Sequence, residues 1–169
     1  MARLSMEFDL DWGHWNRNVV AHECGHALTA WVLGSDVEEI AVGPGAYAEF
    51  GTELAGYVIH DRQCLSPFHR LCVSLAGTLA EGEPWRIGSW DLNNAADLVA
   101  EYYGRPMPDF TKTEYFRRAA TKVNDILERW SLALSCLIFK LQRHYKLDRA
   151  AIDRTLRRCG VRQEISSNS

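Results

Sequence analysis

The stretch that organises this sequence is residues 19–34, which read VVAHECGHALTAWVLG. It contains the pattern H-E-x-x-H, with His22 and His26 four residues apart. Residues at this spacing lie on the same face of an α-helix, so the two imidazoles can bind one metal ion. Glu23 lies about 100° round the helix from His22, where its carboxylate can reach a water at the metal without being a ligand. The pattern predicts half of a zinc site beside a general base.

The residues around this pattern favour a helix. Asn16 or Asn18 could cap its start, and apolar residues fill its body. Gly34 is typical of the residue that ends an α-helix in the left-handed backbone conformation. Gly25 inside a helix costs roughly 1 kcal/mol relative to Ala, so its presence predicts that another backbone or a substrate passes close by. Cys24 is about 200° round the helix from the first histidine, and we expect it to point into the core.

Length, charge and cysteine content limit the class of protein. A chain of 169 residues, 47% of them hydrophobic, is long enough for one domain with a core. The net charge of −3 leaves no basic excess, so nucleic acid is not an expected partner. The five cysteines form no C-x-x-C pair, which argues against a disulfide framework and a cysteine-ligated zinc site. A reducing, cytoplasmic location is the simplest expectation.

Hydropathy predicts neither a signal peptide nor a membrane span. Acidic residues stand near the N-terminus, where a signal peptide needs an apolar run. The longest apolar run, residues 132–139, is far shorter than the roughly 20 residues of a transmembrane helix. We therefore expect neither export by a signal peptide nor a membrane span.

Hydrophobic periodicity predicts a mainly α fold, an array of about five to six helices with a small β-ribbon. Residues 1–16 are predicted to form an N-terminal arm, residues 17–160 the folded domain and residues 161–169 a flexible tail. Beyond the first helix, the predicted helices run from Pro67 to Glu81, from Ser89 or Asp91 to Gly104, continuously from Thr111 or Thr113 to Tyr145, and from Asp148 to Gly160. The third of these would span about 50 Å at 1.5 Å per residue, long enough to brace the domain or to serve an oligomer.

The predicted β-ribbon lies between the first two helices. Its strands are residues 37–42 and 54–59, joined by a Gly-rich loop at residues 43–53. An exposed ribbon edge beside a zinc helix could bind an extended peptide, although a purely structural ribbon is an equal alternative. The candidate substrate-edge residues are Val37, Ile40, Val42, Tyr57 and Val58.

The third metal ligand is not determined by residue type alone. Glu81, Asp91 and Asp97 are all acidic and follow the two histidines on or beside predicted helices. His60, His69 and Tyr57 are candidate donors to an oxyanion, and each has a structural alternative. The local pattern leaves both choices open.

The order of these motifs resembles the proteolytic domain of FtsH, a family of ATP-dependent zinc metalloproteases. The family helix V-A-x-H-E-A-G-H-A-L-x-A corresponds to residues 19–30, with Cys24 at an Ala position. Its L-A-G-R-x-A-E segment corresponds to residues 75–81, with Thr78 where Arg is usual. Its N-D-L-x-x-A-T segment corresponds to residues 90–96, where Trp90 replaces Asn and Ala96 replaces Thr. The resemblance covers nearly all of residues 17–158.

The resemblance implies a site and an activity. The aspartate of N-D-L is the third zinc ligand of the family, and it falls on Asp91; Glu81 is then a helix-end acid outside the ligand set. The implied protein is a zinc metalloendopeptidase with one Zn²⁺ per chain. It would hydrolyse peptide bonds of unfolded or flexible proteins with a zinc-activated water and Glu23 as general base.

The sequence also departs from this family. It contains no G-x-x-x-x-G-K-[ST] motif for nucleotide binding, so an AAA+ ATPase or an adaptor would be a separate chain. Family members assemble as rings, which makes a homo-oligomer an expectation. The substitutions at residues 78, 90 and 96 could weaken metal affinity or activity by about 10 to 100-fold. The alternatives are therefore a weak or inactive zinc-binding module that acts through protein–protein interaction, and a helical protein with an accidental H-E-x-x-H.

Overall fold

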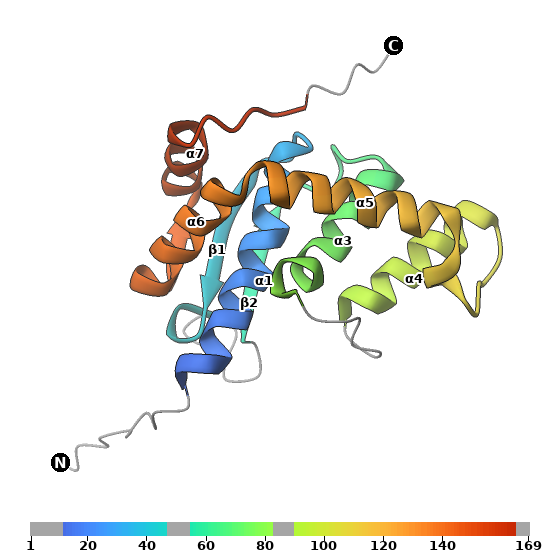
Figure 1. Cartoon of the computed structure of the whole chain (residues 1–169), viewed down its shortest axis with the longest axis horizontal. Helices are drawn as coiled ribbons and strands as arrows, with labels where there is room; N and C mark the ends of the chain where they lie inside the picture. Colours follow the sequence, from blue (N-terminus) through green and yellow to red (C-terminus); the bar gives the residue numbers. More distant parts are fainter. Residues whose placement is uncertain (1–11, 47–54, 83–89, 165–169) are drawn as a thin grey trace.

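The chain folds as helices arranged around a central helix, with a small sheet on one side (Figure 1). The computed structural model describes residues 12–46, 55–82 and 90–164. The helices are α1 (Trp12–Val32), α3 (Pro67–Glu81), α4 (Trp90–Tyr103), η1 (Phe110–Lys112), α5 (Glu114–Arg129), α6 (Ser131–His144) and α7 (Arg149–Arg158), and the strands are β1 (Val37–Val42), β2 (Gly56–His60) and β3 (Lys146–Asp148). The predicted mainly α fold with a small β element is confirmed.

Helix α1 forms the centre of the core, packing on α3, α5, α6 and the sheet. A Cβ atom built on Gly25 would lie 2.6 Å from the carbonyl oxygen of Ala76 on α3. The two helices can approach this closely only because residue 25 has no side chain, which confirms the predicted backbone contact. Cys24 is fully buried, also as predicted.

Several helix ends follow the predicted capping chemistry. The Ser66 side chain accepts a hydrogen bond from the His69 amide before α3, and Thr113 and Asp148 cap α5 and α7 in the same way. Gly34 follows α1 with a left-handed φ of 92°. The start of α1 was predicted wrongly: the helix already includes residues 12–16, so neither asparagine caps it. The rest of the predicted N-terminal arm, residues 1–11, lies outside the described residues.

The sheet has a third strand that periodicity did not predict. The strand order is β2-β1-β3, with both pairs antiparallel. Because β3 pairs with β1, the predicted edge at Val37, Ile40 and Val42 is wrong: β1 is the middle strand, and these three side chains are at most 1% exposed. Tyr57 and Val58 lie on the outer strand β2 and are half-buried. Most of the predicted loop, residues 47–53, lies outside the described residues.

The single long helix expected up to residue 145 is also wrong. It is divided at Trp130, whose φ of −111° and ψ of 27° interrupt the helix between α5 and α6. Figure 1 shows the chain changing direction there. The two halves have different partners, since α5 packs mainly on α3 and α6 on α1. Tertiary packing on two different helices therefore outweighs the continuous helical pattern.

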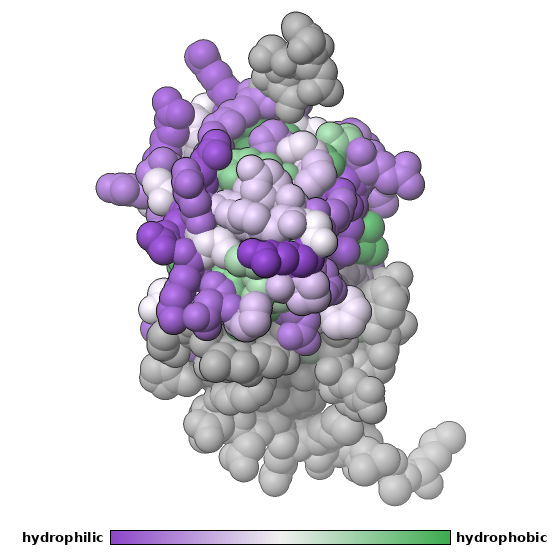
Figure 2. Space-filling view, turned by 90° about the vertical axis from the view of Figure 1, so that its right-hand side faces the viewer, coloured by the Kyte–Doolittle hydropathy of each residue, from purple (hydrophilic) through white to green (hydrophobic). Residues whose placement is uncertain are grey.

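The two ends of the described domain are held by specific contacts. At the end formed by α4 and the start of α5, the Tyr102 ring stacks on Tyr115 with centroids 3.9 Å apart, and the surrounding surface is mostly hydrophilic (Figure 2).

Residues 161–164, predicted as part of a flexible tail, instead lie against the domain. The Glu164 amide donates to the Val32 carbonyl at 2.6 Å, and its carboxylate pairs with Lys122 at 2.7 Å. None of the described helices is both long and apolar enough to span a bilayer.

Candidate metal centre

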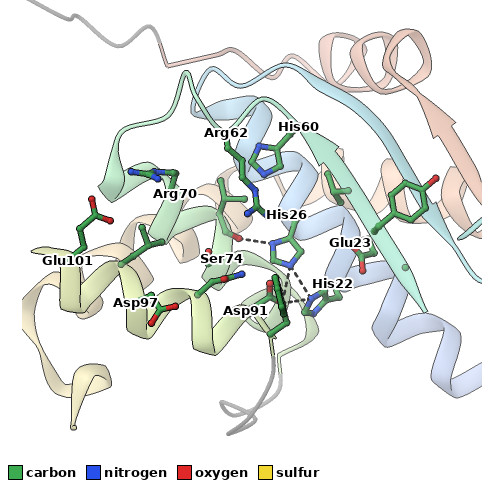
Figure 3. A pocket seen from close by; sticks show the side chains of 17 residues that line it. His22, Glu23, His26, His60, Arg62, Arg70, Ser74, Asp91, Asp97 and Glu101 are labelled. Carbon is green, nitrogen blue, oxygen red and sulfur yellow. Dashed lines mark hydrogen bonds and ion pairs between the residues drawn. The ribbon is translucent and has the colours of Figure 1, made fainter. Parts of the chain in front are cut away.

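Three potential metal ligands converge where α1 meets the first turn of α4. His22 and His26 project from one face of α1, and Asp91 comes from α4 (Figure 3). The Asp91 Oδ2 atom lies 2.8 Å from His22 Nε2 and 3.3 Å from His26 Nε2, and the two Nε2 atoms are 3.0 Å apart. This group could hold a metal ion. Of the three acidic candidates, only Asp91 joins the histidines in it.

The opposite nitrogen of each imidazole is held by an acceptor. His22 Nδ1 lies 2.5 Å from Oε1 of Glu81, the last residue of α3, and His26 Nδ1 lies 2.6 Å from the carbonyl oxygen of Val73. Carbonyl and carboxylate oxygens accept, so each Nδ1 must donate its proton. In the neutral rings, both Nε2 atoms then carry lone pairs that point toward Asp91. Glu81 thus contacts His22 from outside the group of three potential ligands.

The donor set fits a cation. Two imidazole lone pairs and a carboxylate oxygen repel one another when they face the same point, and a single shared proton can lie between only two of them. A metal ion interacts favourably with all three atoms at once. An imidazole held through its other nitrogen by a carboxylate or a carbonyl is the usual arrangement around protein-bound metals. The hydrogen bonds at Nδ1 and the three convergent ligand atoms therefore both indicate that the group could hold a metal ion.

Two glycines provide the space for this group. A Cβ atom on Gly77 of α3 would lie 2.5 Å from His26 Nε2 and 2.6 Å from His22 Nε2. A Cβ atom on Gly56 of β2 would lie 2.7 Å from Cγ of Glu23. Larger residues at either position would occupy the space that the imidazoles and the carboxylate use.

The charges of the group shift its pKa values in a consistent way. Burial lowers the pKa of His22, but the hydrogen bond to Asp91 and three nearby carboxylates raise it to about 9. Burial raises the pKa of Asp91, but the hydrogen bonds and charges of the two imidazoles hold it well below its ordinary value. Both shifts indicate a site that attracts positive charge.

Glu23 lies beside the ligand group and outside it. Its side chain is buried under β2, with the residue 9% exposed. Burial raises the pKa of this carboxyl above its ordinary value, although the imidazoles of His26 and His22 oppose the shift. A carboxylate with a raised pKa holds a proton more strongly, as a general base in a hydrolytic site requires.

A pocket of about 540 Å³ opens next to the group, between α1, β2, α3 and α4. Of the predicted oxyanion donors, His60 and Tyr57 line it, whereas His69 does not. The Tyr57 hydroxyl donates to the Glu39 carboxylate. His60 Nδ1 lies 3.2 Å from Ser35 Oγ, and burial, assisted by the positive charge of Arg62, lowers the pKa of His60 to about 4.

Sequence reasoning missed two arginines of this pocket. Arg62 follows β2 and Arg70 lies in the first half of α3, and both line the pocket wall. Asp97, a rejected ligand candidate, lines it as well. No local pattern distinguishes the two arginines from the others in the chain, because their common position depends on the packing of β2 and α3 on α1.

No family model matches the chain, and no curated protein matches it in sequence. The resemblance to the FtsH proteolytic domain thus rests on the motifs themselves. Of the three departures from those motifs, Thr78 and Ala96 are half-buried, and Trp90 is 75% exposed at the pocket.

Proposed function

We propose that this chain is a zinc metallopeptidase of the FtsH type, which hydrolyses peptide bonds in unfolded or flexible polypeptides. The observation that carries the proposal is the convergence of His22, His26 and Asp91 beside the buried carboxylate of Glu23. Two imidazoles and one carboxylate form a common ligand set of catalytic zinc sites, which leave a further position open. His22 Nε2, His26 Nε2 and the Asp91 carboxylate would hold the ion.

The ion and the neighbouring residues would each have a separate role in hydrolysis. Zinc, when bound, would polarise the substrate carbonyl and lower the pKa of a water from about 15.7 to about 7. Glu23 would accept a proton from the attacking water and deliver it to the leaving amine. Glu81 and the Val73 carbonyl would keep the imidazoles oriented by accepting from their Nδ1 atoms.

The pocket suits an extended polypeptide. Strand β2 is the outer strand of the sheet on the pocket side, with Tyr57 and Val58 on its wall. A peptide strand could pair with its backbone, as substrates do with other exposed sheet edges. The substrate would have to be unfolded to reach this edge, so a separate AAA+ ATPase or an adaptor is part of the proposal, as is a homo-oligomer.

A matched pair of glutamate substitutions tests the activity. Glu23→Gln keeps the size of the side chain but removes the base, and we expect casein hydrolysis to fall by about 10² to 10⁴-fold with zinc still bound at one ion per chain. Glu38→Gln, which changes an exposed glutamate of β1, should leave hydrolysis unchanged. A wild-type protein that binds stoichiometric zinc and cleaves no unfolded substrate would overturn the proposal and favour a zinc-binding interaction module.

A further inference from the structure

Two arginines without acidic partners line the pocket beside the metal-ligand group. Arg62 lies two residues after the end of β2, and its positive charge acts on His60. Arg70 extends from α3 on the side of the pocket where Asp97 and Glu101 of α4 also lie (Figure 3). Within residues 12–46, 55–82 and 90–164, neither guanidinium forms an ion pair or a hydrogen bond. Asp97 and Glu101 share the pocket but do not neutralise either arginine by direct contact.

The Arg70 side chain is partly removed from water without compensation. Its Nε atom is buried and has no hydrogen-bond partner. A buried donor without an acceptor destabilises the folded protein, and more so when the group is charged. An anionic group of a ligand in the pocket would compensate the charge of this guanidinium.

The arginines are also the source of positive charge in this part of the pocket. His60, which lines the same pocket, has a pKa of about 4, so its ring is neutral near pH 7. Guanidinium groups bind planar carboxylates through two parallel hydrogen bonds, which gives both affinity and orientation. A carboxylate bound there would lie in the same pocket as the metal ligands.

We propose that Arg62 and Arg70 select polypeptide substrates that carry a carboxylate next to the cleavage site. This inference rests on the proposed peptidase function and adds the substrate class to it. The carboxylate belongs either to an Asp or Glu side chain or to the C-terminus of the substrate. In the first case the enzyme cuts within chains at acidic positions, and in the second case it trims their ends.

Binding of labelled peptides tests the selectivity without any need for cleavage. The protein carries Glu23→Gln and bound zinc, and fluorescence anisotropy compares peptides that contain Glu or Gln at one position, each with a free or an amidated C-terminus. We expect the carboxylate form to bind about tenfold or more tightly than the matched amide. The Glu–Gln pair reports a side-chain carboxylate, and the free–amidated pair reports a terminal one.

Substitution of the arginines assigns the selectivity to them. Adding Arg62→Gln or Arg70→Gln should reduce the preference for the carboxylate about tenfold and leave the affinity for the amide peptide unchanged. Arg62→Lys keeps the charge but cannot form two parallel hydrogen bonds to a carboxylate, so it should retain part of the preference. Arg154→Gln removes the same charge from an exposed position of α7 outside the pocket and should change neither affinity. Zinc content, measured for each variant, excludes loss of the ion as the cause.

Several results would overturn the inference. One is equal affinity of the unsubstituted protein for carboxylate and amide peptides in both pairs. Another is an unchanged preference in both the Arg62→Gln and the Arg70→Gln variants, which would place the carboxylate on the metal or elsewhere. Acid-selective binding by a wild-type protein that cleaves none of the peptides would instead contradict the peptidase proposal and leave the binding inference intact.

Discussion

At the level of single residues, the hydrogen bonds of the two Nδ1 atoms orient the imidazoles for binding a metal ion. His22 and His26 each donate through Nδ1, one to Glu81 and one to a backbone carbonyl. The second contact cannot be removed by changing a side chain, because Val73 provides it through its backbone. Glu81 is therefore the outer contact whose contribution can be measured by mutation.

Glu81→Gln should weaken metal binding without destroying the site. A glutamine oxygen can still accept from His22 Nδ1, but the negative charge that increases the basicity of the ring is lost. We expect zinc affinity to fall about 10 to 100-fold, measured by competition with a chelating dye at pH 7.5. Glu38→Gln on β1 is the matched control, and an unchanged affinity for Glu81→Gln would show that the carboxylate does not tune the ligand.

His60 predicts a pH dependence of folding stability. Its pKa is about 4 in the folded protein against 6.5 for a free imidazole, so the unfolded chain binds a proton between these values while the folded protein does not. The contribution of the neutral His60 ring to folding stability is therefore fully present above about pH 6.5 and is lost as the pH falls toward 4. His60→Asn should remove about 1 kcal/mol of this loss at pH 5, after allowance for the exposed part of the ring.

The measurement for His60 is the difference in Tm between pH 7.5 and pH 5. This difference should be smaller for His60→Asn than for wild type. His144→Asn, at an exposed position in the last turn of α6, should behave like wild type. Equal acid sensitivity of His60→Asn and wild type would mean that other groups cause the loss.

Some residues of the candidate site follow from the sequence, and others follow only from the fold. The spacing of His22, Glu23 and His26 was enough to place them together, because the periodicity of one helix determines it. Asp91 could be selected only through the resemblance, since residue type left three acids open. Arg62 and Arg70 line one pocket from separate elements, and no periodicity relates a position just after a strand to a position on the following helix.

At the scale of elements, α3 supports both the fold and the ligands through consecutive residues. The backbone of Ala76 contacts α1 at Gly25, and Gly77 leaves room for the tips of both imidazoles. Added methyl groups on either side of this interface should therefore have different consequences. Gly77→Ala should displace the rings, and Gly25→Ala should push the helices apart.

The two variants are distinguished by measuring metal content and stability together. We expect Gly77→Ala to lose most of its zinc while keeping wild-type helical circular dichroism, because the tips of side chains can move aside. Gly25→Ala meets backbone, so it should lower the free energy of unfolding of the metal-free protein by about 1 to 3 kcal/mol. Stoichiometric zinc of wild-type affinity in Gly77→Ala would contradict the role given to this glycine.

The element scale is also where sequence reasoning was wrong. The apolar stripe passes through Trp130 without Gly or Pro, so no local signal marks the division between α5 and α6. Strand β3 has three residues, too few for an alternating pattern to be recognised. Its pairing with β1 makes β1 the middle strand and leaves β2 and β3 as the edges, and only the packing of the C-terminal part of the chain determines that pairing. Helix caps such as Thr113 and Asp148 were predictable, because each acts within one turn.

At the scale of the whole molecule, the ligand group joins parts of the chain that are distant in sequence. His22 and Asp91 are separated by 69 positions, and α3 packs between the helices that carry them. An ion bound by all three ligands would stabilise the relative position of α1 and α4. Unfolding separates the ligands, so metal binding and folding are thermodynamically linked.

Metal removal should therefore lower the melting temperature of the protein. A ligand present at 100 times its Kd stabilises the folded state by about 2.7 kcal/mol, which for a domain of this size corresponds to roughly 5 to 10 °C in Tm. We expect chelation to lower Tm by this amount and added zinc to restore it, measured by differential scanning fluorimetry. Asp91→Asn lacks the charged ligand of α4, so its Tm should respond weakly to either treatment. A wild-type Tm that is insensitive to both chelator and zinc would mean that the three side chains do not bind the ion as one site.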